Sequence, residues 1–188
     1  ITDVGSTKGN VVDAAKAVFG EALPAGFVPG HPIPGAEHTG VHAGKVDLFA
    51  NHKVILTPLP TSAAWAVDKL IQLWQAAKAE VICMDVEKHD EVLAHTSHLP
   101  HLMAFNLVEQ LAKREDNLDI FRYAAGGFRD FSRIAASDPQ MWHDIFFANK
   151  KAILNAVDGF EAQLAIIRKL IEDEDSQALM GLLGHAQA

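Results

Sequence analysis

The chain has 188 residues, of which 49% are hydrophobic, 21% charged and 7% aromatic. These values describe a folded globular chain of one domain or slightly more, and they exclude a disordered or collagen-like protein. The net charge of −8 argues against nucleic-acid binding, and no apolar stretch is long enough to span a membrane. A single cysteine, Cys83, cannot form an internal disulfide, so we expect a cytoplasmic protein.

The chain begins with the pattern of a strand that turns into a helix. Residues 1–5 hold a short apolar run, and Ser6 or Thr7 is predicted to cap the helix that follows. The backbone N–H groups at such a helix start suit an anion or a polar ligand, but an ordinary capped helix is the favoured interpretation. Because the chain opens inside an α/β unit, we expect it to be a fragment of a longer protein.

The first half of the chain continues to alternate between strand and helix patterns. A strand is predicted at Lys53–Leu56, followed by a helix that starts from a cap at Thr61 or Ser62 and ends near Ala79. Another short strand is predicted at Glu80–Met84. This alternation is typical of βαβ units, so we expect a mostly parallel sheet.

The second half is predicted to be all-helical. Helical patterns cover residues 87–114, 118–124 and 139–174. Pro100 removes a backbone donor inside the first of them and is expected to kink it. The tail after Asp175 is expected to fray.

The segment Gly30–Gly40 is rich in glycine, proline and histidine. Pro32 and Pro34 stiffen this predicted loop, and a histidine held there, His31, can act as an acid or a base on a ligand. A purely structural role for His31 is the alternative. The other histidines of this region are expected to be surface residues: His38, His42 and His52.

A second group of histidines follows the dipeptide His89-Asp90. His95, His98 and His101 are spaced by three and share one side of a predicted helix. Zinc ligation is one interpretation, but the usual spacing of four with a nearby third ligand is missing. The alternative is that these imidazoles face a polar cavity beside the kink at Pro100.

The segment Gly126–Arg133 is predicted to link two helices. Its arginines, Arg129 and Arg133, follow a flexible glycine pair and can bind a carboxylate through two hydrogen bonds. A structural ion pair between Arg129 and Asp130 is the alternative.

Five ordered motifs resemble those of prephenate dehydrogenase, and together they span Thr2 to about Leu170: GSTKG, GHPIPGAEHTG, HDEVLAHTSHLPH, AAGGFRDFSRIAASDPQMWHDIF and ANKKAIL. The resemblance implies an α/β part followed by an all-α part. Residues 1–85 would form the C-terminal part of a Rossmann-type nucleotide-binding domain, and residues 86–188 a helical domain for substrate binding and homodimerisation. The implied reaction oxidises prephenate to 4-hydroxyphenylpyruvate, or arogenate to tyrosine, with loss of CO₂ and with NAD or NADP as hydride acceptor.

The resemblance also implies roles for individual residues. His31 matches the catalytic histidine that accepts a hydrogen bond from the ring hydroxyl, and Ser6 matches a serine beside the nicotinamide and that hydroxyl. Arg133 matches an arginine that anchors a substrate carboxylate. The other implied substrate contacts are His98, His101, Glu37, Asp130 and Gly127, and the other implied cofactor contacts are Thr7 and Pro32. Ala36 stands where many relatives carry a hydroxyl, which removes one contact to the substrate.

The sequence contains no GxGxxG motif after a strand, a motif that the family carries upstream of GSTKG. We therefore expect this chain alone to bind a dinucleotide poorly. Two other functions stay open, namely a non-catalytic dimerisation or regulatory module and a His-rich metal enzyme. The apolar stripe of the helix predicted at 139–174 suits a dimer interface or an ordinary core.

Overall fold

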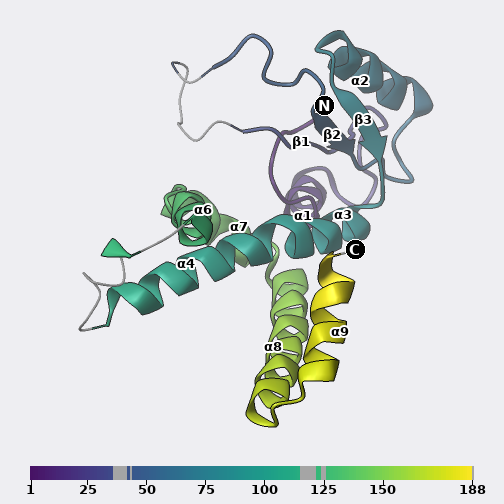
Figure 1. Ribbon diagram of the computed structural model, residues 1–188. Helices are drawn as coiled ribbons and strands as arrows, with labels where there is room; N and C mark the ends of the chain where they lie inside the picture. Colours follow the sequence, from purple (N-terminus) through teal and green to yellow (C-terminus); the bar gives the residue numbers. More distant parts are fainter. Residues whose placement is uncertain (36–41, 43, 115–121, 124–125, 188) are drawn as a thin grey trace.

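The computed structural model describes residues 1–35, 42, 44–114, 122–123 and 126–187 (Figure 1). The helix predicted at 118–124 falls mainly outside these ranges, and so do Ala36, Glu37 and His38. Among the described residues, no helix is both long enough and apolar enough to cross a membrane.

A three-stranded sheet lies at the centre of the first half of the chain. Strand β2 (Lys53–Leu56) occupies the middle and pairs in parallel with β3 (Glu80–Cys83), which confirms both predicted strands. Strand β1 (Gly30–Pro32) pairs with β2 in the antiparallel direction. The prediction of a mostly parallel sheet therefore holds for one of the two pairs, and His31 lies in a strand rather than in a loop. Two parallel strands must be joined by a crossover connection, usually a helix. Residues 45–51, which precede β2, form turns, in keeping with the antiparallel pairing of β1 and β2.

Helix α2 (Ala64–Ala76) covers the sheet and contributes to the first core the buried Ala66 and four partly buried side chains, Val67, Leu70, Ile71 and Trp74. Its caps differ from the prediction, because the Ser62 hydroxyl donates to the carbonyl oxygen of Phe27 instead of capping the helix. The buried residues of this core come from the sheet, its approach and the helix: Val28, Val54, Leu56, Ala66 and Ala79.

Helix α1 (Gly9–Phe19) is capped by a residue that is distant in the sequence. The Asp90 carboxylate accepts hydrogen bonds from the backbone N–H groups of Lys8 and Gly9, at 2.9 and 2.8 Å. The predicted caps at Ser6 and Thr7 are wrong, since neither side chain bonds to the first turn's N–H groups, and the Thr7 hydroxyl donates to the Asn10 side chain. Residues 1–5 form no regular strand.

The second half begins with one long helical segment that crosses the molecule (Figure 1). Helix α3 (Val86–Leu93) continues into the π-helical turn η2 (Ala94–His98) and then into α4 (Leu99–Ala112). Pro100 stands in the first turn of α4, directly after the π turn. The kink predicted at this proline stays a prediction, and the structure shows a change in helical winding just before it, next to the missing backbone donor.

The remaining helices correct three predictions. Residues Gly126–Ala135 form helix α6, which packs against α4, and are not a linker. The helix predicted at 139–174 is two helices, α7 (Pro139–Ala148) and α8 (Lys150–Glu172), with Asn149 between them. The tail forms α9 (Ser176–Gln187), which packs along α8 as a hairpin rather than fraying (Figure 1).

A second, smaller core joins η2 to the start of α8. Ala94, Ile153 and Ala156 are buried there, and Leu99, Leu102, Phe146, Ala152 and Val157 pack around them. The π turn therefore lies against the helix that follows Asn149, and this contact brings His98 close to the junction between α7 and α8.

The turn between Asp3 and Lys8 is fixed against β1. The fully buried Lys8 ammonium forms an ion pair with Asp3 and donates to the carbonyl oxygen of Gly30. Asp3 also accepts hydrogen bonds from the backbone N–H groups of Gly5 and Gly30, at 2.9 and 3.0 Å. An added Cβ at Gly30 would lie 3.2 Å from both the Asp3 carbonyl oxygen and Leu56 Cδ2, so only glycine fits easily. These contacts hold the turn that carries Ser6 next to the strand that carries His31.

Removing the partner of the buried Lys8 charge is expected to destabilise the fold. Asp3→Ala leaves the ammonium buried without a carboxylate and should lower the free energy of unfolding by about 3 kcal/mol. The control is Glu91→Ala, which breaks the exposed pair with Lys88 and should cost less than about 0.5 kcal/mol. Urea denaturation of the three proteins measures both values, and equal effects of the two substitutions would contradict a structural role for the buried pair.

Candidate active site

Three polar side chains form a continuous chain of hydrogen bonds between the sheet and α3. Nδ1 of His31 in β1 lies 2.9 Å from Nε2 of His89, and Nδ1 of His89 lies 2.7 Å from Oδ1 of Asp90. His89 is fully buried and His31 is 8% exposed. The two rings meet edge to face with centroids 5.1 Å apart. Two segments that are 58 residues apart in the sequence thus meet through a buried polar contact.

Asp90 is held in its ionised form. Burial by itself would raise the pKa of this carboxyl, but hydrogen bonds from His89 and from the backbone of Gly9 and Lys8 outweigh burial and lower it. The same carboxylate therefore satisfies the start of α1 and receives the His89 imidazole.

The hydrogen-bonding capacity of each group decides which ring nitrogens carry protons. An ionised carboxylate only accepts, so Nδ1 of His89 is the donor to Asp90. With His89 neutral, its Nε2 atom accepts, and Nδ1 of His31 must be the donor. Nε2 of His31 then carries a lone pair, and among the described residues it has no hydrogen-bond partner. His31 therefore presents a fixed hydrogen-bond acceptor to the site.

His31 stays neutral over the physiological pH range. Burial is the main cause, followed by His89, Lys8 and His98, and together they lower the pKa of His31 to about 3. Asp3 opposes this shift. The Nε2 lone pair is consequently available at any pH at which the protein would normally work.

His98 lies on η2, close to the same cluster, and is 1% exposed. Its Nδ1 atom lies 3.2 Å from Nδ2 of Asn149, whose amide also donates to the backbone carbonyl oxygen of Asp90 at 2.7 Å. Burial lowers the pKa of His98 to about 4, with Asp90 opposing and His89 and His101 adding to the shift. His98 is therefore a second buried neutral imidazole.

His101 stands one turn further on, in α4, and stacks on Trp142 of α7. The ring centroids are 3.7 Å apart with 21° between the planes, and Nδ1 of His101 donates to the carbonyl oxygen of Ser97 at 2.8 Å. Burial lowers the pKa of His101 as well, against the effect of the hydrogen bond to Ser97. The Trp142 ring is buried, and its indole N–H has no partner among the described residues. The stack gives this side of the cluster an aromatic wall.

The residues expected around a cofactor occupy neighbouring positions in the first half of the chain. Ser6 is half-buried in the turn that Lys8 anchors to Gly30, and Pro32 follows His31 in β1. Thr7 is buried, and its hydroxyl is used by Asn10.

The helix start that follows this turn does not offer an anion site. The carboxylate of Asp90 already occupies the N–H groups of Lys8 and Gly9. These two N–H groups are therefore not available to the pyrophosphate of a dinucleotide.

The residues expected to bind substrate carboxylates lie on a separate helix. Arg133, Asp130 and Gly127 are exposed on α6, which packs against the helix that carries His101. Glu37 lies outside the described residues. The structure thus brings together His31, His98 and His101, and it leaves the α6 residues at the surface of the adjoining helix. Of the histidines expected at the surface, His42 and His52 are exposed.

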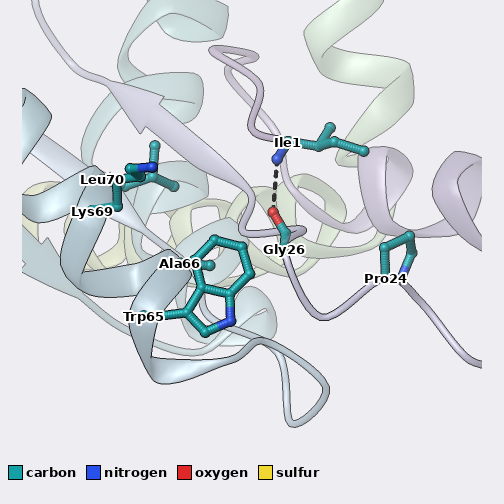
Figure 2. A pocket seen from close by; sticks show the side chains of 7 residues that line it. All are labelled: Ile1, Pro24, Gly26, Trp65, Ala66, Lys69 and Leu70. Carbon is teal, nitrogen blue, oxygen red and sulfur yellow. Dashed lines mark hydrogen bonds between the residues drawn. The ribbon is translucent and has the colours of Figure 1, made fainter.

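Two apolar pockets lie outside the histidine cluster. One, of about 170 Å³, lies between the N-terminal segment and α2, where Trp65, Leu70 and Pro24 form its walls and the Ile1 backbone nitrogen donates to Gly26 (Figure 2). The other, of about 240 Å³, lies between α4 and α7 and shares Trp142 with the histidine stack. Within the described ranges, no group of three or more His, Cys, Asp or Glu side chains is arranged to hold a metal ion.

Sequence reasoning missed two residues of this cluster and undervalued a third. His89 was noticed only as part of the dipeptide His89-Asp90, and Asn149 and Trp142 were not singled out. Asn149 lies inside the single helix predicted at 139–174, so no local signal marked it. Nothing local to Asp90 could show that it caps α1, because that contact spans 81 and 82 residues.

Comparisons with known proteins cover both halves of the chain. Residues 1–83 match the family model "Prephenate dehydrogenase, nucleotide-binding domain", and residues 85–185 match "Prephenate dehydrogenase, dimerization domain". Prephenate dehydrogenase of Bacillus subtilis is 43% identical over 180 residues, which are 95% of this chain and 48% of the relative. Cyclohexadienyl dehydrogenase of Zymomonas mobilis is 38% identical over 182 residues, 96% of this chain and 61% of the relative.

A solved structure shows the same fold. The crystal structure of prephenate dehydrogenase from A. aeolicus in complex with hydroxyphenyl propionate and NAD⁺ superposes with a TM-score of 0.89 at 38% identity. The match covers 99% of this chain and 64% of that one, so this chain spans between about half and two thirds of the proteins described here. Since the dimerization-domain model alone covers more than half of the residues, the chain belongs to the prephenate dehydrogenase family.

Proposed function

We propose that this chain carries the substrate pocket of an NAD- or NADP-dependent prephenate or arogenate dehydrogenase, together with the histidine that accepts a hydrogen bond and a proton from the substrate. The observation that carries the proposal is the series of hydrogen bonds from Asp90 through His89 to His31, which leaves Nε2 of His31 as a hydrogen-bond acceptor. The chain divides into a partial nucleotide-binding domain, 1–85, and a helical domain, 86–188. Its free cysteine fits the reducing cytoplasm.

His31 is the group that faces the reacting hydroxyl. Its Nε2 atom accepts a hydrogen bond, and then the proton, from the ring hydroxyl as the C–O bond becomes a carbonyl. A proton on Nε2 makes Nδ1–H a stronger donor toward His89, whose other nitrogen is bound to the Asp90 carboxylate. Asp90 therefore stabilises the positive charge that forms on the two imidazoles.

The remaining chemistry needs little from side chains. NAD or NADP supplies the hydride acceptor. The hydride leaves the ring carbinol carbon as its hydroxyl becomes a carbonyl. Cleavage of the bond to the ring carboxylate then releases CO₂, its electron pair enters the ring, and the carbonyl oxygen takes the proton back from His31 as the ring becomes an aromatic phenol. The protein's task is to place the ring carbinol between His31 and the cofactor and to exclude water.

The other site residues are assigned by the family resemblance together with their position. Ser6 is assigned to the nicotinamide and the ring hydroxyl, because its turn is anchored beside β1. Arg133 is assigned to a substrate carboxylate, with Asp130 and Gly127 beside it on α6. His98 and His101 are assigned to the substrate, Glu37 to the pocket entrance, and Thr7 and Pro32 to the cofactor.

A second copy of the chain is the proposed partner of the helical half. The chain exposes 12743 Å², whereas a compact monomer of its mass would expose about 8,800 Å². The hairpin of α8 and α9 projects from the rest of the molecule, and the last buried residue of α8 is Ala156 (Figure 1). The large apolar side chains that this hairpin leaves exposed are Leu154, Leu164, Ile166, Ile171, Met180 and Leu183. Such a surface is typical of an obligate interface, and the matched dimerization-domain model agrees with it.

The non-catalytic module is the less supported alternative. A dimerisation module would need the apolar hairpin but not two buried neutral histidines in a hydrogen-bonded cluster. Burying such groups costs free energy without strengthening a dimer, so their presence favours the enzyme.

The activity is tested by nicotinamide absorbance with prephenate or arogenate and with NAD or NADP. We expect turnover from a version in which a GxGxxG-containing segment precedes residue 1, and little from the 188-residue chain alone. In the longer version His31→Asn should lower kcat by 10²- to 10⁴-fold, about 3 to 5 kcal/mol of transition-state stabilisation, with a smaller effect on KM. The exposed His52→Asn is the control. Absence of turnover from both versions would favour the module.

The pH profile tests the low pKa of His31. The neutral form is active, so activity falls only as pH drops through the pKa, which burial lowers to about 3. In the longer version kcat/KM should therefore show no acidic limb from His31 between pH 8 and pH 5. A limb centred near the ordinary histidine pKa of about 6.5, and absent from His31→Asn, would contradict a buried neutral base.

The dimer is tested by sedimentation of the 188-residue chain. We expect a mass of twice 20.4 kDa, and the double variant Leu164→Lys with Ile171→Lys should sediment as a monomer because it places two charges in the apolar interface. Val18→Lys, on the exposed side of α1, is the matched control and should leave the dimer intact. A monomeric wild-type chain, or equal behaviour of both variants, contradicts the proposal.

A further inference from the structure

Asn149 occupies an unusual place for an asparagine. It stands between α7 and α8, where a polar residue is ordinarily exposed, and yet it is only 6% exposed. Its backbone N–H donates to Ile145 and its carbonyl oxygen accepts from Ile153, so the main chain serves both helices without help from the side chain. The amide nitrogen instead contacts α3 and η2.

The orientation of that amide is determined by Asp90. The backbone carbonyl oxygen of Asp90 can only accept, so the amide atom 2.7 Å from it is the NH₂ group. The same nitrogen lies 3.2 Å from Nδ1 of His98. An NH₂ hydrogen cannot face a ring N–H, so Nδ1 of His98 is the acceptor. The neutral His98 ring consequently carries its proton on Nε2.

This protonation state is opposite to those of the two neighbouring histidines. His31 and His101 both carry the proton on Nδ1, because His89 and the Ser97 carbonyl oxygen accept from them. His98 alone has an N–H at Nε2, and among the described residues this group has no partner. Nε2 of His31 can therefore accept a hydrogen bond, whereas the Nε2–H group of His98 can donate one.

We propose that Asn149 is a positioning residue that holds His98 as a hydrogen-bond donor to an oxygen atom of the substrate. The inference rests on the proposed function, because prephenate and arogenate carry several carboxylate oxygens and one hydroxyl. A donor at His98 and an acceptor at His31 distinguish an anionic oxygen from the hydroxyl, so the ring binds in one orientation. Asp90 fixes the protonation states of both His31 and His98. Its carboxylate accepts a hydrogen bond from His89, and its carbonyl oxygen accepts one from Asn149.

The first test reads the protonation state directly and needs no catalysis. Long-range ¹H–¹⁵N correlation spectra of the ¹⁵N-labelled 188-residue chain at pH 7 distinguish the two neutral forms of His98, with His98→Gln used for assignment. We expect the proton on Nε2 in the wild type. Asn149→Asp replaces the donor by an acceptor and should move the proton to Nδ1, while Asn155→Asp, on the exposed side of α8, should change nothing. A wild-type proton on Nδ1 overturns the inference.

The second test measures ligand binding. The dissociation constant for 4-hydroxyphenylpyruvate, measured by calorimetry on the longer version loaded with NAD, should rise about tenfold in Asn149→Asp and stay unchanged in Asn155→Asp. In the His98→Gln background, the glutamine amide donates whatever residue 149 is, so Asn149→Asp should have no further effect.

The outcomes separate the inference from the proposed function. An undiminished loss in the His98→Gln background would show that Asn149 acts on the fold and not through His98, and would overturn the inference. Failure of the wild type to bind the ligand would overturn it as well. Binding without turnover of prephenate or arogenate would contradict the proposed function while the binding and protonation results still support the role of Asn149.

Discussion

The Asp90 carboxylate is the contact on which the candidate site depends. Its two oxygens satisfy the first N–H groups of α1, and one of them also accepts from His89. The backbone carbonyl oxygen of Asp90 accepts a hydrogen bond from the side chain of Asn149, at the junction between α7 and α8. A single residue thereby joins the N-terminal turn, the sheet histidine and the helical half. These partners keep the Asp90 carboxylate ionised. Because an ionised carboxylate can only accept, the direction of each hydrogen bond from Asp90 to His31 follows from its charge.

Charge is distributed so that His31 and His98 stay neutral beside the buried Lys8 and the half-buried Asp90. Lys8 is compensated by Asp3 and by the Gly30 carbonyl oxygen, and Asp90 by backbone N–H groups. The imidazoles between them are buried, which lowers the pKa values of His31 and His98. A substrate with carboxylate groups would raise these values on binding, since an opposite charge favours the protonated ring. Under the proposed function, the site would accept a proton during the reaction without being protonated beforehand.

The two halves of the chain contribute different parts of the site. The sheet and the N-terminal turn carry His31 and Ser6, whereas the helical half carries His89, His98, His101 and Asn149. Their meeting requires α3 to lie against α1, and η2 against α8. Beyond Ala156, the projecting part of the hairpin of α8 and α9 supplies no residue to this cluster, so an interface formed there would not disturb the histidines.

The sequence by itself determined what depends on local pattern or on long matching motifs. The strands at Lys53–Leu56 and Glu80–Cys83, the change from α/β to all-α and the family all follow from periodicity and ordered motifs. Local pattern failed where a distant residue supplied the missing partner. Ser6 and Thr7 were expected to cap α1, but Asp90 does so, and the tail expected to fray is stabilised by packing on α8. The direction of β1, the link between His31 and His89 and the buried amide of Asn149 were decided only by tertiary structure, because each depends on segments brought together from far apart in the chain.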